Sequence, residues 1–294
     1  MYSGDEPAPV GELRRCAVLG RPIEHSLSPV LHTAGYRAAG LRGWNYERID
    51  CGAEDLPDLV AALSSDWRGL SVTMPGKSAA AAVADVRSPR VDRLRVANTL
   101  VRLPDGGWSA ENTDVDGVIG ALAAHRVPVG GRALVLGGGG TALAVVAALA
   151  ERGVDSLVVA GRRPESTAAA LELAGALGLN AHGIGFDVAA VAGLGSCELV
   201  VSTVPAGAAD PLAELLAEVP VVLDVVYHPW PTPLAAAGAA DRVVVTGQDM
   251  LLHQAVRQFE LFTGQLAPIA AMRDALAAAV PDGPPLPLPG DGAA

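Results

Sequence analysis

Lysine is almost missing from this sequence. Lys77 is the only lysine, although Lys and Arg together number 21 in 294 residues. An arginine guanidinium stays protonated at any workable pH, whereas a lysine ammonium can lose its proton when it is desolvated. The lone lysine is therefore either a chance survivor on a solvated face or a group kept because it exchanges a proton.

Positive charge, aromatic side chains and cysteine are also scarce. The formal net charge of −11 argues against nucleic acid or an anionic membrane as a partner. Aromatic residues make up 4%, so the core must be built mainly from small aliphatic side chains. Cys16, Cys51 and Cys197 are widely spaced, with no CxxC motif or Cys/His cluster. This spacing predicts buried thiols and no metal site.

The sequence shows neither a leader nor a membrane span. The N-terminal stretch MYSGDEPAPVGE is acidic and lacks the apolar segment of a signal peptide. No apolar run has the length and flanks of a transmembrane helix. We therefore expect a cytoplasmic protein. Residues 1–11 and 281–294 are rich in Pro, Gly and acidic residues, which predicts disorder at both ends.

Between these ends, short apolar strands alternate with alanine-rich helices, which is typical of an α/β fold. From residue 132 the predicted strands are almost entirely apolar, as expected when helices cover both faces of a sheet. This change predicts two domains. The first, 12–112 plus 248–280, is an α/β domain to which the C-terminal helices could return, and the polar residues described below predict that it is the substrate-binding and catalytic domain. The second, 113–247, is a Rossmann-like dinucleotide-binding domain.

A glycine-rich turn separates an apolar strand from a long helix in ALVLGGGGTALAVVAALAERG, residues 133–153. Gly137, Gly139 and Gly140 permit a tight turn and close approach of a pyrophosphate to the backbone. The following helix, which includes Thr141 in its first turn, supplies unpaired N–H groups. A tight turn without a ligand is the alternative, but the strand–turn–helix context favours a dinucleotide site.

The next predicted strand ends in Gly161, Arg162 and Arg163. An NAD site carries an acidic residue near this position for the ribose 2′-hydroxyl, whereas guanidinium groups suit a 2′-phosphate. An exposed pair of charges at a strand end is the alternative. We predict NADP as the cofactor, with Arg162 as the first choice for the phosphate and Arg163 assisting it.

Polar residues gather in the first predicted domain where strands end and helices begin. Ser26 and Ser28 precede a helix that has Pro29 in its first turn. Ser28 suits a helix N-cap, but two hydroxyls beside a helix N-terminus also suit a small carboxylate. The further candidates are Thr73, Lys77, Asn98, Thr99, Asp114 and Gln254.

Taken together, these stretches resemble the shikimate dehydrogenase family from about residue 14 to about residue 280. The matching motifs, in the family's order, are GRPIEHSLSP, SVTMPGK, VANTL, ENTDVDG, GGGGTALA, VVYHPWPTPL and GQDMLLHQAVRQFELFTG. The resemblance implies reversible, NADP-dependent reduction of 3-dehydroshikimate to shikimate, in aromatic amino acid biosynthesis. It also implies a fold of two α/β domains.

The resemblance further implies roles for single residues. Lys77 and Asp114 would form the acid–base pair, and Ser26 and Ser28 would hold the substrate carboxylate. The remaining substrate contacts would be Thr73, Asn98, Asp114, Tyr227 and Gln254, with Gly247 where backbone approaches the nicotinamide. Hydride addition to a ketone builds negative charge on oxygen, so a proton donor is needed there. Lysine at position 77 is explained if arginine cannot do that work.

Some positions depart from the family's usual pattern. Asparagine is frequent where this chain has Ser71 and Thr33, a polar residue is frequent at Gly161, and Ser or Thr is frequent at Arg163. Quinate or aminoshikimate as the substrate stays an alternative, as does a non-catalytic NADP-binding regulator of the same fold. Lys77, Asp114 and Gln254 together argue against the regulator. Monomer and homodimer both stay open.

Overall fold

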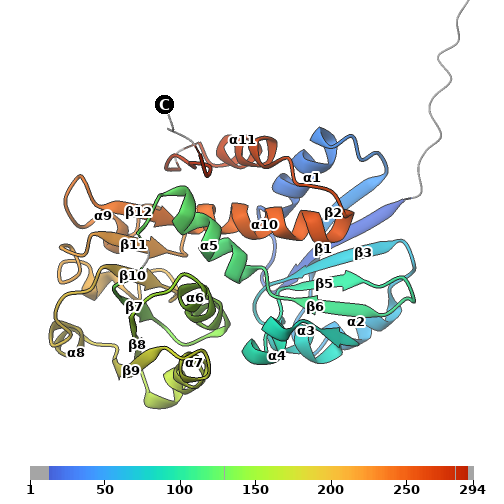
Figure 1. Cartoon of the computed structure of the whole chain (residues 1–294). Coiled ribbons are helices and arrows are strands. Elements are labelled where there is room, and N and C mark those ends of the chain that lie inside the picture. The colour runs from blue at the N-terminus through green and yellow to red at the C-terminus, as the bar shows by residue number, and fades with distance from the viewer. Residues whose placement is uncertain (1–12, 129, 282, 291–294) are drawn as a thin grey trace, which may run out of the picture. The chain divides into compact units, whose positions relative to one another are not determined.

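The computed structural model describes residues 13–128, 130–281 and 283–290, and Figure 1 shows their helices and strands. The predicted disorder of residues 1–11 lies outside the described residues, as do residues 282 and 291–294 of the tail. The described part of that tail forms neither helix nor strand, although Leu286 within it is buried.

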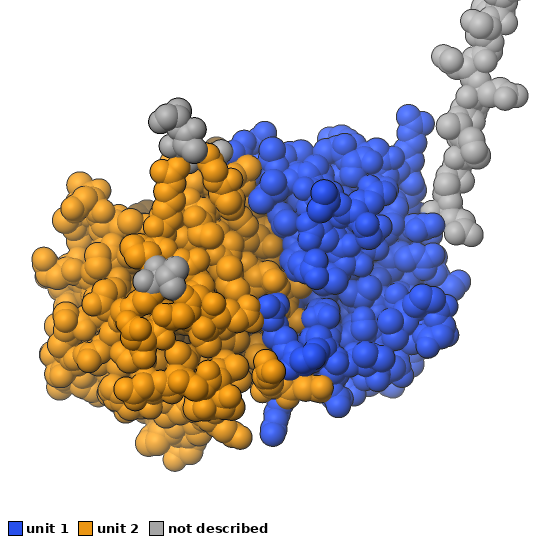
Figure 2. Space-filling view, viewed as in Figure 1, with its two compact units in different colours: residues 1–91, 95–111, 255–279 blue, residues 92–94, 112–254, 280–294 orange. Residues whose placement is uncertain are grey.

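The chain divides into two compact units, coloured separately in Figure 2. Unit 1 comprises Met1–Val91, Arg95–Glu111 and Ala255–Ala279, and unit 2 comprises Asp92–Leu94, Asn112–Gln254 and Val280–Ala294. Each unit contains one sheet with helices packed on it, so the predicted α/β class is confirmed. The functions assigned to the two parts of the chain stay predictions.

Unit 1 is built on a mixed, six-stranded sheet in the order β2-β1-β3-β5-β6-β4. The parallel strands are β1 (Arg14–Gly20), β2 (Trp44–Asp50) and β3 (Trp67–Val72). β5 (Thr99–Arg102) runs antiparallel to β3 and to β6 (Trp108–Glu111), and β4 (Val86–Arg87) is parallel to β6. The ends of β1, β3 and β6 therefore meet the start of β5 at one edge, called here the carboxyl edge of unit 1.

Helices cover both faces of this sheet. On one face, α2 (Leu56–Ala62) and α3 (Lys77–Val83) contribute to a core with Leu19, Leu70 and Val72 of the strands. α4 (Pro89–Leu94) begins with Ser88 as a side-chain cap that accepts from the Val91 amide. α1 (Ser28–Ala38) packs against α11 (Ile269–Ala279).

The C-terminal helices return to unit 1, as predicted. Gly35 in α1 has no side chain, and a Cβ there would contact Phe259 and Met272. Phe259 belongs to α10 (Gly247–Thr263) and Met272 to α11, and both side chains are fully buried. Burial of such large apolar groups is the main source of stability at this packing surface. The small residue in α1 therefore lets two later helices pack closely on it.

Unit 2 contains a six-stranded, parallel sheet in the order β12-β11-β10-β7-β8-β9. Its strands are β7 (Arg132–Leu136), β8 (Ser156–Gly161), β9 (Asn180–Gly185), β10 (Leu199–Ser202), β11 (Val221–Asp224) and β12 (Val243–Thr246). The strand order reverses at β7, with β8 on one side and β10 on the other. In sheets of this kind ligands bind at the carboxyl ends of the strands beside such a reversal.

The central strands of unit 2 are buried on both faces, as predicted. Ala133, Leu134, Val135 and Leu136 of β7 are each no more than 1% exposed. The helices of this unit are α5 (Asp114–Ala124), α6 (Gly140–Glu151), α7 (Pro164–Ala176), α8 (Val188–Ala192), η1 (Asp210–Leu212) and α9 (Pro233–Ala236). α6 packs against α5 and α7, while η1 packs against α8 and α9.

A reciprocal capping box starts α10. The Thr246 hydroxyl accepts from the Asp249 amide at 3.2 Å, and the Asp249 carboxylate accepts from the Thr246 amide at 2.8 Å. This pairing satisfies backbone donors that a helix start otherwise leaves without partners. The same carboxylate contacts His125 Nε2, with 3.0 Å between Asp249 Oδ1 and the ring nitrogen. Asp249 thus links the start of α10 to the end of α5 within unit 2.

The described ranges bear on three further expectations. Across residues 13–128, 130–281 and 283–290, no helix has both the length and the apolar character needed to cross a membrane. Over the same ranges, no cluster of His, Cys, Asp and Glu side chains is arranged to hold a metal ion. The three cysteines are buried thiols, as predicted, and burial raises the pKa of Cys16 to about 12 and that of Cys197 to about 11.

Candidate active site

Main-chain hydrogen bonds bring Thr73, Lys77 and Asn98 together at the carboxyl edge of unit 1. The amide of Val72, the residue before Thr73, donates to the Asn98 carbonyl at 2.7 Å. The amide of Ala97 donates to the Lys77 carbonyl at 2.9 Å. Three residues from two separate stretches are therefore fixed side by side by their own backbones. Lys77 is the first residue of α3, a short helix that the sequence analysis did not predict.

Ser26 and Ser28 lie together in the segment that follows β1. The Ser26 hydroxyl donates to the Ser28 hydroxyl at 3.3 Å and accepts from the Ser28 amide at 3.4 Å. The N-cap interpretation of Ser28 is wrong, because Leu27 occupies the cap position and α1 has no side-chain cap. Ser28 is already inside the helix, so its hydroxyl is not used by the helix start.

Arg48 supports the serine pair and was missed by the sequence analysis. Its guanidinium donates twice to the Ser26 carbonyl, at 2.9 Å from Nε and 2.5 Å from Nη2. Arg48 lies on β2, twenty-two positions away along the chain from Ser26. In a strongly acidic protein, this local cation sits beside the two hydroxyls proposed for a carboxylate. The sequence around Arg48 has no pattern that predicts this contact, because the contact forms only when the strand folds beside the serine segment.

Asn98 is held from inside unit 1. Its side-chain oxygen accepts from the Thr99 hydroxyl at 2.8 Å, and its backbone carbonyl accepts from Gln258 Nε2 at 3.2 Å. Asn98 is 3% exposed and Gln258 1% exposed, so both amides are shielded from solvent. Gln258 was also missed, although it stands four residues after Gln254 on α10. Residues four apart on a helix lie on the same face, so this spacing could have predicted that Gln258 lies near the site if Gln254 does.

Asp114 and Gln254 belong to unit 2, on two helices that pack closely. Asp114 begins α5, and Gln254 lies on the part of α10 that belongs to unit 2. A Cβ at Gly117, one turn after Asp114, would lie 3.0 Å from the Gln254 Cβ. Both candidate side chains are buried. Lys77 belongs to the other unit, so its pairing with Asp114 stays a prediction.

Tyr227 and Gly247 are neighbours in unit 2. A Cβ at Gly247 would lie 3.2 Å from a ring carbon of Tyr227 and would collide with the Val225 carbonyl. Only glycine therefore fits at the start of α10. Burial raises the pKa of Tyr227 above its ordinary value, so the hydroxyl stays protonated at neutral pH. It can then donate a hydrogen bond.

The glycine-rich turn lies after β7, at the point where the strand order reverses. Gly137 has φ of 107°, a left-handed conformation that favours glycine, and a Cβ there would meet the Thr203 hydroxyl. Gly139 faces open space, because a Cβ there would have no atom within 4 Å. α6 begins at Gly140, with Thr141 next. An open backbone before a helix N-terminus is what a pyrophosphate requires.

Arg162 and Arg163 follow the last residue of β8, and Gly161 explains a departure from the family pattern. A Cβ at Gly161 would collide with the side chains of Ser166 and Thr167 in the first turn of α7. The Ser166 hydroxyl donates to the Arg163 carbonyl at 2.6 Å. The Ser166 hydroxyl and the Thr167 methyl group therefore occupy the space that a side chain at position 161 would fill. Both guanidinium groups lie on exposed residues.

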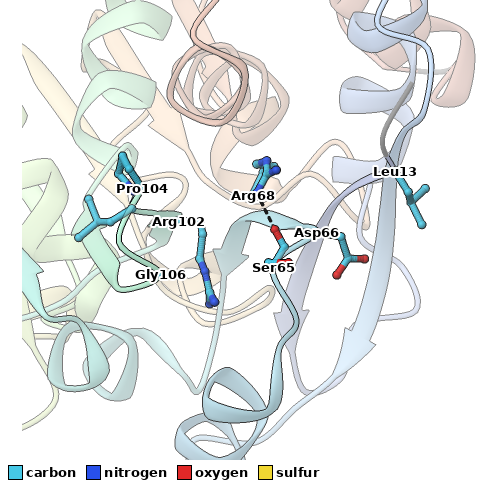
Figure 3. Close-up of a pocket in the computed structure, with 8 residues that line it drawn as sticks. Leu13, Ser65, Asp66, Arg68, Arg102, Pro104 and Gly106 are labelled. Carbon is cyan, nitrogen blue, oxygen red and sulfur yellow. Dashed lines mark hydrogen bonds between the residues drawn. The ribbon is translucent and has the colours of Figure 1, made fainter. Parts of the chain in front are cut away.

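Each unit has a cavity at the edge of its sheet opposite the edge that carries the candidate residues. A cavity of about 650 Å³ in unit 1 lies where β1 and β3 begin and β5 turns into β6 (Figure 3). There Arg68 donates to the Ser65 carbonyl at 2.7 Å, and Arg102 also lines the cavity. A cavity of about 390 Å³ in unit 2 lies where β10, β11 and β12 begin. None of the predicted site residues lines either cavity.

Two family models match the chain. The model described as the shikimate dehydrogenase substrate binding domain covers residues 18–100. The model described as the shikimate 5'-dehydrogenase C-terminal domain covers residues 247–277. Among curated proteins, the chain is 42% identical over 265 residues to the shikimate dehydrogenase (NADP(+)) of Methylobacterium radiotolerans. The match covers 85% of this chain and 91% of that protein.

Solved structures give the same picture. Mycobacterium tuberculosis shikimate dehydrogenase has a TM-score of 0.85 and 50% identity, covering 90% of this chain and 99% of that one. Shikimate 5-dehydrogenase of Thermus thermophilus, crystallised with NADP(H) and shikimate, has a TM-score of 0.79 and 36% identity. That match covers 91% of this chain and all of the other, 100%.

Proposed function

The chain belongs to the shikimate dehydrogenase family, and on that premise we propose that it interconverts 3-dehydroshikimate and shikimate with NADP(H). The observation that carries the proposal is the backbone cluster that holds Thr73, Lys77 and Asn98 side by side at the carboxyl edge of unit 1. It places the single lysine of the chain beside two uncharged polar side chains. A ring that carries several hydroxyls and one reacting oxygen needs a proton donor and uncharged hydrogen-bonding partners.

The substrate is held at two ends. Ser26 and Ser28 bind the carboxylate with their hydroxyls, and Arg48 holds the Ser26 carbonyl. Thr73 and Asn98 contact the ring oxygens. Tyr227 and Gln254, from the chain's other unit, add a hydroxyl donor and an amide. These uncharged donors and acceptors fix the orientation of the ring without adding net charge.

Lys77 moves the proton. Its ammonium donates to the carbonyl oxygen, where charge builds during reduction, and recovers the proton in the reverse direction. Asp114 orients the ammonium and accepts a hydrogen bond from the substrate hydroxyl. An arginine in place of Lys77 would keep the charge but hold its proton too tightly to transfer it.

NADP fits the residues of unit 2. Gly137, Gly139, Gly140 and Thr141 offer an open backbone and a helix start for the pyrophosphate. Arg162, assisted by Arg163, meets the 2′-phosphate, and the backbone at Gly247 approaches the nicotinamide. When bound, the cofactor supplies or accepts the hydride. Residues 113–247 thus serve the cofactor, and residues 12–112 with 248–280 serve the substrate.

The test is nicotinamide absorbance during turnover of shikimate with NADP, in the wild-type protein and in Lys77→Arg and Lys77→Met. We expect both variants to lose about 10²–10⁴-fold in kcat, because each removes the transferable proton. The KM for NADP should not change, since the residues proposed for NADP belong to the other unit. NAD and quinate serve as comparison substrates, and both should be turned over less efficiently.

Two results would contradict the proposal in different ways. If Lys77→Arg retains most of its turnover, positive charge is the only requirement and Lys77 is not the acid–base group. If the wild-type protein binds NADP but turns over neither shikimate nor quinate, a non-catalytic role replaces the enzyme. Size-exclusion chromatography with light scattering on the same samples decides between monomer and homodimer.

A further inference from the structure

We propose that Gln258 is a positioning residue that sets which end of the Asn98 side-chain amide faces the substrate, acting through Thr99. The inference rests on the proposed function, because it requires Asn98 to contact the substrate ring. Gln258 lies on α10, and its amide bonds to Ser71, Asn98 and Thr99 rather than to the candidates for proton transfer. Its effect is to orient the one side-chain amide among the candidates of unit 1.

The orientation of Gln258 is fixed by a backbone carbonyl. One end of its amide contacts the Asn98 carbonyl oxygen at 3.2 Å. A carbonyl oxygen can only accept, so the group facing it must be the Gln258 nitrogen. The Gln258 oxygen must then be the end that contacts Ser71 Oγ, at 2.7 Å. This assignment follows from chemistry and needs no assumed hydrogen position.

From Gln258, the hydrogen bonds of the structure continue through Thr99 to the Asn98 side chain. The Gln258 nitrogen also donates to Thr99 Oγ1 at 3.0 Å. The Thr99 hydroxyl hydrogen then points away from Gln258, and the Asn98 side chain receives it at 2.8 Å. The group that receives it must be the Asn98 oxygen, since an amide nitrogen cannot accept. The NH₂ end of Asn98 is therefore the end directed away from Thr99.

A second branch anchors the same glutamine. Because the Gln258 oxygen accepts from Ser71, the Ser71 hydroxyl must itself accept from the Tyr46 hydroxyl, at 2.6 Å. The Tyr46 ring stacks on His32, with ring centroids 4.1 Å apart and 4° between the planes. The relay, defined as Tyr46, Ser71, Gln258, Thr99 and Asn98, thus runs in one direction from an anchored ring to a candidate substrate contact.

Burial makes the relay directional in practice. Every member of the relay is no more than 5% exposed. Bulk water therefore offers the relay few alternative partners, and reversal of one hydrogen bond would leave a buried group without its partner. The consequence for specificity is that the ring substituent facing Asn98 has to be an acceptor. An oxygen satisfies this requirement, whereas an ammonium group does not.

The test compares Thr99→Val with Thr99→Ser. Valine matches threonine in shape but lacks the hydroxyl that sets Asn98, whereas serine keeps it. We expect Thr99→Val to raise the KM for shikimate roughly tenfold, as for loss of one well-placed hydrogen bond. The KM for NADP should stay at its wild-type value. Thr99→Ser should return the KM for shikimate to within about twofold of the wild-type value.

Further variants keep the test decisive. Gln258→Met removes the donor at similar length and should act in the same direction, even if Thr99→Val folds poorly. Combined with Asn98→Ala, Thr99→Val should have no further effect, because the group that it orients is gone. Thr263→Val, which removes a hydroxyl that contacts the Phe259 carbonyl and the Gln265 amide, is the matched control. It should leave both KM values unchanged.

The outcomes separate this inference from the proposed function. Wild-type turnover of shikimate with an unchanged KM in Thr99→Val and Gln258→Met overturns the inference alone. Equal damage in Thr99→Ser and Thr99→Val, or additive effects in the Asn98→Ala background, also overturns it. Failure of the wild-type protein to bind shikimate by calorimetry overturns both the inference and the function on which it rests.

Discussion

Among single residues, His32 shows most directly how burial controls charge. Its side chain is fully buried and stacks on Tyr46. Burial lowers the pKa of His32 to about 3 because the interior disfavours the imidazolium. The residue is therefore neutral in the folded protein at every pH where the enzyme would work. It supports the relay as a flat, uncharged ring.

Protonation of His32 should make the protein unstable in acid. Between its unfolded pKa of about 6.5 and its folded pKa of about 3, the unfolded state binds more protons. The free energy of unfolding should thus fall as pH falls below about 6.5, by at most about 1.4 kcal/mol per pH unit from this group. Urea unfolding at a series of pH values measures this slope.

His32→Phe is the variant for that measurement, because it keeps a ring against Tyr46 and removes the titration. It should lose the His32 share of the slope, while the share of His253, whose pKa burial also lowers, remains. Identical slopes in the wild-type protein and the variant would mean that the pKa of His32 in the folded protein is close to its ordinary value.

Residue-level prediction from the sequence succeeded where a residue heads or ends an element. The glycines after β7 and the cysteines are examples, because turns and burial leave local signatures. The relay could not be predicted, since Ser71 and Gln258 are 187 positions apart and meet only after folding. Gly161 was noticed as a departure, but its cause lies in α7, which contributes no motif of its own. The roles of the catalytic and binding candidates stay predictions.

At the level of elements, α10 shows how a helix is started and what it carries. Its first turn is closed by the Thr246–Asp249 capping box, and its second half supplies Gln258 to unit 1. The sequence predicted this helix well because its apolar positions recur with helical spacing over many turns. Short elements such as α3, α8 and η1 have too few residues for any period, so they were missed.

Thr246→Ala should weaken the start of α10. It removes the hydroxyl that accepts from the Asp249 amide and donates to the Asp249 carboxylate. We expect a loss of about 0.5–2 kcal/mol in the free energy of unfolding, as for other N-cap deletions. Urea unfolding measures the loss, and Thr246→Ser, which keeps the hydroxyl, should restore most of it. A wild-type value in Thr246→Ala would mean that the backbone amide at position 246 and His125 hold Asp249 without the hydroxyl.

For the whole molecule, acidity and cofactor preference have to be reconciled. The chain carries a formal charge of −11, and both proposed ligands are anions. Binding must therefore depend on a few local cations, of which Arg162 is the first choice for the 2′-phosphate. A ligand that binds only the folded state raises its stability in proportion to the logarithm of ligand concentration over Kd.

NADP should consequently protect the protein from thermal unfolding more than NAD does. At a hundredfold excess over Kd, the stabilisation is about 2.7 kcal/mol. Arg162→Ala should lose most of the NADP effect and leave the NAD effect unchanged, because only NADP carries the 2′-phosphate. Differential scanning calorimetry of both proteins with each nucleotide measures this. Equal protection by NAD and NADP would remove the basis for assigning the phosphate to Arg162.

The contact of Gly161 with Ser166 and Thr167 bears on how this protein can evolve. A lineage that shifts to the unphosphorylated nucleotide needs an acidic side chain at the end of this strand. At position 161 a Cβ would collide with Ser166 Oγ and Thr167 Cγ2, so both side chains would have to move before an acidic residue could fit there. The shift must start instead at the arginines, or after Thr167 has become smaller. The packing of α7 against Gly161 therefore opposes a change of cofactor, in addition to the positive charge of the two arginines.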